Sequence, residues 1–513
     1  MKKQKEQTTN KNRLGGGGYF NKLLTKDVRE INKVFLSLFC MGIIVIAIYT
    51  SINLTKSSYA LFSDTIKGEK TIEVEIDLGL DKSGANPPVL DTNMIPVYYD
   101  ETAKVWKKAD SSNKRRAYKW YDYDNKMWAN SVTVSSTNRE KYKEAKLGTE
   151  IPMDDILTMQ VWVPRYKYKV WNYNSDGVTY SNPKEIEIVF ENGTERTGDI
   201  ECTDTIIKTS GSKSESCKIN GVECTDSTCN NKYYTHPAFW KDKNSNSIHD
   251  NNEEIEGFWI GKFETTGSIS NITIKPNITP LLNQTVGNFY NAFLEMNDSG
   301  NIYGFNTNTD THMIKNMEWG AIAYLSHSKY GTCTNGQCHE VGINNKGNYN
   351  SSTYISSGTI TGCGDKPGSP SSSTCNSYDT KLGMGASTTG NIYGVYDMSG
   401  ANFEFVSASM IKSDGNFIAP PGISYGLSKI YHDYYSYGTT DTDSIAIKRG
   451  KLGDATKESI NWYDDYSKQV YISGFWMSRS LLHDDKFSAG VFAYQRIATD
   501  AASLVSSRLA INF

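Results

Sequence analysis

The sequence predicts an α+β fold rich in strands, preceded by a small β domain and an N-terminal transmembrane helix. Three observations predict it. Short alternating or apolar runs, such as TIEVEIDLGL and EIEIVF, recur between turn residues from residue 58 onward. Two stretches, 284–297 and 312–331, carry apolar residues at helical spacing. The run 34–52 is apolar and uncharged, and the length of 513 residues allows at least two folded units.

The first 52 residues predict a membrane anchor. As a helix, VFLSLFCMGIIVIAIYTSI at 34–52 would extend about 28 Å, roughly one hydrocarbon core. Residues 1–33 are polar and rich in Lys and Arg, so we expect a disordered cytoplasmic tail and a single-pass protein whose bulk is extracellular. The alternative is a signal peptide cleaved near Ser58-Tyr59-Ala60, which sends the chain to the same side.

Charge and cysteine content favour an exported chain. The net charge is -3 without a basic stripe, so a nucleic-acid partner is not expected. Cys40 lies in the apolar run, and the other eight cysteines predict disulfides. The expected pairs are Cys202 with Cys217, Cys224 with Cys229, Cys333 with Cys338, and Cys363 with Cys375. Zinc is the rival, but no Cys-x-x-Cys pair exists and histidine is scarce.

The extracellular part is expected to contain two domains. Residues 58–154 alternate short β-type runs with turns and predict a β-rich stalk whose Trp106, Trp120 and Trp128 are core residues. The strand LTMQVWVPRYKYKVW has an aromatic-rich face unlike the short runs before it, so a second domain is expected at 155–513. Within it, the Gly/Ser/Thr/Asn-rich region 331–389 predicts a surface insertion stapled by its cysteines.

One loop carries oxygen side chains at calcium-binding spacing. The sequence DKNSNSIHDNNE matches loop positions 1, 3, 5, 9 and 12, which suits Ca²⁺ as a cofactor. Ser247 stands at the turn position where Gly is usual, and a hydrophilic hairpin tip is the alternative. The candidate ligands are Asp242, Asn244, Asn246, Asp250 and Glu253.

The most specific motif is YGVYDMSGANFEF at 393–405. Ser399-Gly400 predicts a tight turn, because Gly tolerates positive φ and Ser forms local hydrogen bonds. Glu404 then stands between two aromatic residues, as in a half-buried strand.

Together with MQVWVPRYKYKV, GFWIGKFETT and Glu318-Trp319, this motif resembles the formylglycine-generating, sulfatase-modifying family, a variant of the C-type-lectin fold. The resemblance covers 154–513 and departs from the family pattern at Ala401 and Asn402. It implies that the acid of the motif is buried, hydrogen-bonded and structural, because a buried carboxylate needs such partners.

The family's chemistry is not expected here. Its catalytic members bind copper through paired cysteines near the C-terminus, and an iron-dependent branch uses clustered histidines. The last cysteine of this chain is Cys375, and only His432 and His483 follow His339. No nucleophile elbow is visible. We therefore expect a non-enzymatic protein without copper or iron. The alternatives are a modifying enzyme with an unrecognised site and a self-assembling envelope protein.

Residues 473–513 keep the family's frame at Arg479, Ala489-Gly490 and Arg508-Leu509, while the intervening residues look unconstrained. This layout resembles the variable proteins of diversity-generating retroelements, which display a lectin-fold ligand face. It implies a surface protein that binds an extracellular protein or glycan. The expected ligand-facing residues are Trp476, Ser478, Leu481, Leu482, His483, Asp484, Asp485, Lys486, Phe487, Tyr494, Arg496, Ile497, Thr499, Asp500, Ser503 and Leu504. The alternative is a fixed strand pair with buried apolar residues.

Overall fold

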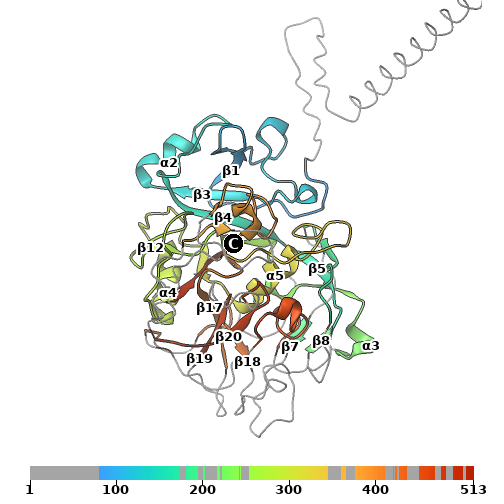
Figure 1. Cartoon of the computed structure of the whole chain (residues 1–513). Coiled ribbons are helices and arrows are strands. Elements are labelled where there is room, and N and C mark those ends of the chain that lie inside the picture. The colour runs from blue at the N-terminus through green and yellow to red at the C-terminus, as the bar shows by residue number, and fades with distance from the viewer. Residues whose placement is uncertain are drawn as a thin grey trace, which may run out of the picture. The chain divides into compact units, whose positions relative to one another are not determined.

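The computed structural model describes residues 80–172, 181–193, 200–202, 217–219, 222–241, 243, 253–344, 360–364, 376–410, 420, 422–423, 427–435, 450–467, 475–480, 489–500 and 504–513 (Figure 1). They belong to one compact unit, Gly79–Phe513. The predicted tail and the anchor at 34–52 lie outside them. Among the described residues, no helix has the length and apolar character to span a membrane.

A seven-stranded antiparallel sheet in the order β14-β22-β11-β4-β3-β1-β2 forms the larger layer. Apart from the β1–β2 hairpin, neighbouring strands are separated by at least twenty residues, so long-range packing sets most of their order. The strands are β1 (Ile95–Asp100), β2 (Val105–Lys108), β3 (Asn130–Val134), β4 (Ile156–Pro164), β11 (Gly257–Gly261), β14 (Asp310–Met313) and β22 (Leu509–Asn512).

This sheet crosses the domain boundary expected at residue 154. β3 pairs with β4 from Asn130, opposite Val161, to Val134, opposite Ile156. β1, β3 and β4 accordingly lie together in Figure 1. The indole of Trp120 stacks on that of Trp259, with ring centroids 6.2 Å apart. The described part of 58–154 therefore shares a sheet and a core with the second region, which differs from a separate stalk.

The smaller layer is a five-stranded sheet in the order β18-β17-β19-β20, with β21 paired to β17. β17 runs parallel to β18 and β21 and antiparallel to β19. The turn of the 393–405 motif leads directly into β17, as the sequence predicted. The strands are β17 (Phe403–Met410), β18 (Asp433–Tyr435), β19 (Phe475–Arg479), β20 (Tyr494–Ala498) and β21 (Val505–Ser507).

The two longest described helices confirm the helices expected at 284–297 and 312–331. Thr285 caps α4 by accepting a hydrogen bond from the Asn288 backbone N–H. Every residue of α5 is buried. The described α-helices are α2 (Ser136–Lys143), α3 (Asp226–Cys229), α4 (Val286–Leu294) and α5 (Asn316–Ser326). A strand-rich chain with few helices, as predicted, is thus confirmed.

Smaller elements complete the described fold. A three-stranded sheet contains β5 (Tyr166–Lys169), β6 (Ile188–Phe190) and β10 (Tyr233–Thr235), and another contains β7 (Ile200–Cys202), β8 (Cys217–Ile219) and β9 (Val222–Glu223). Two hairpins pair β12 (Thr266–Ser268) with β13 (Asn271–Thr273) and β15 (Cys363–Gly364) with β16 (Asn376–Ser377). The 3-10 helices are η1 (Arg116–Tyr118), η2 (Tyr123–Asn125), η3 (Pro237–Phe239), η4 (Glu295–Asn297), η5 (Gly383–Ala386) and η6 (Trp462–Asp464).

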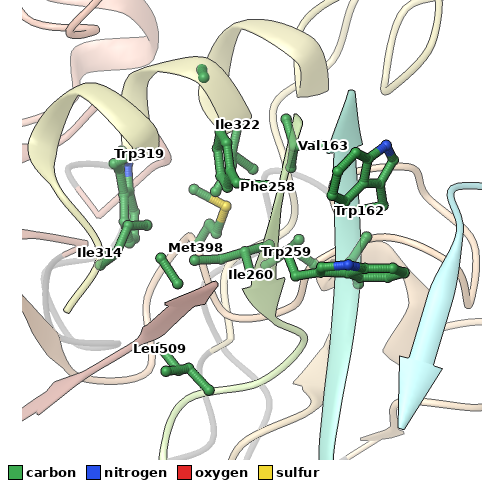
Figure 2. Close-up of a cluster of buried hydrophobic side chains, with 14 of the residues drawn as sticks. Trp162, Val163, Phe258, Trp259, Ile260, Ile314, Trp319, Ile322, Met398 and Leu509 are labelled. Atoms are coloured by element: carbon green, nitrogen blue, oxygen red, sulfur yellow. The ribbon is translucent and has the colours of Figure 1, made fainter. Parts of the chain in front are cut away.

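The core lies between α5 and the seven-stranded sheet. Figure 2 shows Trp319 and Ile322 reaching from α5 toward Phe258 and Ile260 of β11. All four side chains are fully buried. The Trp319 indole N–H also donates to the Val491 carbonyl at 2.9 Å, so the core reaches the C-terminal region.

The region 331–389 is not a simple surface insertion. Several of its described side chains are fully buried, including Asn344, Thr361 and Ala386. Asn344 pairs with the 393–405 motif through a backbone bridge to Gly400. The described ends of 331–389 are therefore part of the core, where Asn344 pairs with the turn of the 393–405 motif.

Candidate functional site

The 393–405 motif contributes Glu404 to a fully buried ion pair with Arg508. Glu404, in β17, accepts hydrogen bonds from Arg508 Nε at 2.9 Å and from Arg508 Nη2 at 2.5 Å. Arg508 Nη1 donates to the Gly261 carbonyl at 2.9 Å. Burial raises the pKa of Glu404 and Arg508 opposes this. Glu404 is thus buried and hydrogen-bonded, as expected, and its oxygens are occupied by structural partners.

Two more buried carboxylates surround this pair. Glu264 accepts hydrogen bonds from Asn402, from the backbone N–H at 3.1 Å and from Nδ2 at 2.8 Å. Asp397 accepts from Asn344 Nδ2 at 2.7 Å, from the Gly362 N–H at 2.8 Å and from the Thr361 hydroxyl. Asn402 therefore supplies both of these donors to Glu264, and the side-chain donor is one that an apolar residue could not provide. These donors tie both carboxylates to the turn.

Gly400 is hydrogen-bonded to the residues that flank 481–488, a stretch that holds seven of the predicted ligand-facing residues. Ser480 Oγ donates to the Gly400 carbonyl at 2.6 Å, and the Gly400 N–H donates to the Ala489 carbonyl at 2.8 Å. Gly400 has φ +74, and a Cβ there would lie 2.6 Å from the Asn344 oxygen, so only glycine fits. Residues 480 and 489, which flank 481–488, are held at one point.

The expected frame residues are buried and anchored. Arg479 donates from Nε to Asn316 Oδ1 at 2.6 Å, from Nη1 to the Ala455 carbonyl at 3.1 Å and from Nη2 to the Asp454 carbonyl. The Gly490 N–H donates to Asp465 Oδ1 at 2.8 Å. Polar groups with this many partners cannot shift without leaving buried groups unsatisfied.

Three of the predicted ligand-facing residues are core residues, which corrects the prediction. Trp476, Ser478 and Tyr494 are at most 1% exposed. Arg479 lies opposite Tyr494 in the β19–β20 ladder, so these two side chains share one face, while Trp476 and Ser478 occupy the other. Both faces are buried: Trp476 packs on the His432 ring at 4.7 Å, and on the other face Arg479, 5.3 Å from the Tyr494 ring, is hydrogen-bonded to Asn316 of α5.

The other predicted residues fall into two groups. Asp500 is exposed, and Arg496, Ile497, Thr499 and Leu504 are half-buried. Arg496 and Ile497 lie on β20, and Thr499 and Asp500 follow it. Leu504 instead precedes β21, which pairs with the opposite end of β17, on the side away from β19 and β20. The remaining predicted residues lie outside the described part of the chain: Leu481, Leu482, His483, Asp484, Asp485, Lys486, Phe487 and Ser503.

One residue of the predicted calcium loop is described. Glu253 is buried and accepts hydrogen bonds from Trp240 Nε1 and from the Lys243 N–H, each at 3.0 Å. Both carboxylate oxygens therefore have protein donors, which does not favour bidentate binding of Ca²⁺. The other four candidates, Asp242, Asn244, Asn246 and Asp250, lie outside the described residues.

Two of the four expected disulfides are present among the described residues: Cys224–Cys229 and Cys333–Cys338. Cys202 and Cys217 are direct cross-strand partners in β7 and β8, in the register that their pairing requires. Cys363 is buried, and its expected partner Cys375 lies outside the described residues.

A Ser–His contact that sequence reasoning missed lies between β17 and β18. His432 Nδ1 lies 2.9 Å from Ser407 Oγ, and Nε2 lies 2.8 Å from Ser409 Oγ. A catalytic triad needs a carboxylate on the second ring nitrogen, and a serine takes that place here. Burial, and secondarily Lys451, lowers the pKa of His432 far below its ordinary value. The sequence signal available for this contact was that Ser407 and Ser409 are alternate residues of one strand, so their side chains share a face.

His312 is held between two carboxylates. Its Nδ1 lies 3.0 Å from Asp310 Oδ1, and its Nε2 lies 3.1 Å from Glu318 Oε1. Burial opposes the imidazolium, but Glu318 and Asp310 outweigh burial and raise the pKa of His312 to about 9. Glu318 also accepts the Lys315 N–H at 2.9 Å, so the cluster fixes the start of α5.

No protein-family model and no curated protein sequence matches this chain. A function is therefore inferred from the arrangement of its own residues.

Proposed function

We propose that this chain is a membrane-anchored, non-enzymatic surface protein that binds an extracellular protein or glycan through its C-terminal region. The scaffold is a domain of the C-type-lectin, formylglycine-generating type. Ca²⁺ in the loop 242–253 remains part of this proposal. The uncharged run 34–52 supports the anchor.

One observation carries the proposal: in the C-terminal region, buried and anchored residues at 476–480 and 489–494 are followed by more accessible residues at 495–497 and 499–500. Arg479, Ala489 and Gly490 are buried and hydrogen-bonded, whereas Asp500 is exposed and its neighbours are half-buried. Both ends of 481–488 are tied to Gly400. Binding residues commonly lie on loops that a rigid scaffold positions. Such a division lets the binding residues change while the fold is kept, which favours diversification by a retroelement.

Substitution of the accessible residues tests binding. We would combine Arg496→Ala, Thr499→Ala and Asp500→Ala in the full chain, purified in mild detergent. The control combines Arg115→Ala, Ile302→Ser and Glu101→Ala, which are exposed residues elsewhere on the unit. Glycan arrays and panels of secreted proteins provide the probes. Loss of a wild-type interaction, with an unchanged melting temperature and an unaffected control, supports the proposal. Equal binding by all three proteins contradicts it.

Sequencing the gene from several isolates tests diversification separately. A near-copy of the 3′ end, beside a reverse transcriptase and differing mainly at adenines, is expected. Variation should fall on codons 481–487 and 496–500 and spare those for Trp476, Arg479 and Tyr494, since these three are buried. An invariant 3′ end would leave a fixed binding module and exclude diversification.

A further inference from the structure

His327 faces the Cys333–Cys338 disulfide at the end of α5. Its Nδ1 lies 3.9 Å from Cys333 Sγ. The candidate ligand atoms of His327, Cys333 and Cys338 all lie within 4.8 Å of one another. His327 and Cys333 are buried, and Cys338 is half-buried, so one side of the cluster can be reached from solvent. The sequence did not point to this cluster, because its spacing is not that of a common zinc motif.

The imidazole is held with one nitrogen toward the sulfur atoms. Nε2 lies 3.3 Å from the Tyr463 hydroxyl, and the rings of Trp462, Tyr463 and Phe492 pack around His327 with centroids 5.1, 5.5 and 5.6 Å away. With its proton on Nε2, the ring donates to Tyr463 Oη and directs the Nδ1 lone pair at Cys333. A polar partner on the second nitrogen is how metal-binding histidines are commonly oriented.

The two cysteines are positioned by backbone hydrogen bonds as well as by the disulfide. The Cys333 N–H donates to the Ser328 carbonyl at 3.2 Å. Thr334 and Gln337 exchange backbone hydrogen bonds of 2.8 and 3.0 Å across the turn between the cysteines. Lys126 Nζ donates to the Cys333 carbonyl at 2.9 Å. These contacts keep Cys333 and Cys338 adjacent when the sulfur–sulfur bond is open.

We propose that reduction of the Cys333–Cys338 disulfide turns this cluster into a Zn²⁺ site, with His327 Nδ1 and the two Sγ atoms as ligands and water in the fourth position. Zinc–sulfur bonds of about 2.3 Å and zinc–nitrogen bonds of about 2.0 Å in a tetrahedron place these ligand atoms roughly 3.5–3.8 Å apart. The observed nitrogen–sulfur distance of 3.9 Å needs little adjustment.

The redox step balances with a dithiol as the reductant. The dithiol gives two electrons and two protons to the sulfur–sulfur bond and itself becomes a disulfide. The bond breaks into two thiols, and Zn²⁺ displaces their two protons as it binds.

The chain contains a matched control. Cys224–Cys229 has the same sequence separation of 5 and is also buried. Among the described residues, a metal-suited group with a histidine forms at Cys333 and Cys338 and not at this second pair. Reduction of the control pair therefore yields two thiols without the histidine ligand.

The test uses Co²⁺ as a spectroscopic substitute for Zn²⁺, with the full chain in mild detergent under anaerobic conditions. A phosphine supplies the two electrons without competing as a thiol ligand. We expect one Co²⁺ per reduced chain, thiolate-to-cobalt absorption, displacement of Co²⁺ by Zn²⁺, and no binding by the oxidised chain. Cys224→Ser/Cys229→Ser should keep the site, and Cys333→Ser/Cys338→Ser should lose it. His327→Gln should weaken binding at least tenfold.

Two results would overturn the proposal. One is equal cobalt absorption by the reduced wild type and by Cys333→Ser/Cys338→Ser, which would place the metal on other thiols. The other is loss of the folded circular-dichroism signal on reduction in the presence of Zn²⁺, because the site requires the native backbone around His327.

Discussion

Glu404 and Arg508 form a two-pronged ion pair whose side chains are both 0% exposed. Glu404 lies in β17 of the smaller sheet, and Arg508 directly precedes β22 of the larger one. Because Arg508 also donates to Gly261 at the end of β11, a single guanidinium connects the two sheets.

Glu404→Gln should destabilise the protein by about 3–5 kcal/mol, because it removes the carboxylate that forms an ion pair with the fully buried Arg508 guanidinium. Urea unfolding of the variant and the wild type measures the difference. Lys107→Met is the control, since the Lys107–Asp100 pair is solvent-accessible and should contribute little to stability. Equal effects of the two substitutions would contradict a structural role for the buried pair.

Gly320→Ala should destabilise, although alanine is normally better than glycine in a helix by about 1 kcal/mol. Gly320 lies inside α5, where a Cβ would stand 2.1 Å from the Gly453 oxygen and 2.8 Å from Asp454 Cα. Relieving these clashes should cost about 2–3 kcal/mol. Thermal unfolding measures it, with the exposed helical substitution Ser136→Ala as the control. A rise in melting temperature for Gly320→Ala would show that the backbones are not in close contact.

Stability should depend on pH through His312. Its pKa is raised to about 9 in the folded chain, above its ordinary 6.5, so the imidazolium stabilises the fold fully below pH 6.5 and loses this effect as pH rises through 9. The pKa difference corresponds to a contribution on the order of 3 kcal/mol. The unfolding free energies of wild type and His312→Gln, compared from pH 6 to 10, should converge as pH rises. A constant difference would mean that His312 keeps one protonation state throughout.

Ser480→Ala should cost about 1–3 kcal/mol, because the buried Gly400 carbonyl loses its side-chain donor. Under the proposed function, binding should also weaken, since one end of 481–488 is released from Gly400. Calorimetric melting and a binding titration measure the two effects. The exposed substitution Ser299→Ala should change neither. Normal stability of Ser480→Ala would rule out an anchoring role for this hydroxyl.

Local patterns predicted local structure well. Helical spacing located α4 and α5, and two cysteine pairs five residues apart formed the expected disulfides. The motif around Glu404 indicated a turn, and each of these features is decided by residues close in sequence. The burial of its acid was implied only by the family resemblance, because its partner Arg508 is distant in sequence.

Features that depend on distant partners were not predictable. Tyr494 looked accessible because the sequence does not show that Arg479 would lie against its ring. The boundary at residue 154 looked plausible because strand pairing between β3 and β4 leaves no composition signal. The contact of His327 with Cys333 is local, and it was missed because the spacing of these residues matches no common zinc motif.

β22 occupies an inner position in the larger sheet, between β11 and β14. During synthesis the chain must therefore be complete through residue 512 before these two strands can be joined. Until then each presents an open edge, the state in which chains are most prone to aggregate and to be captured by chaperones or proteases. Maturation of this fold is consequently all-or-none with respect to β22: products that stop before this strand are exposed to quality control, and those that include it can close the sheet.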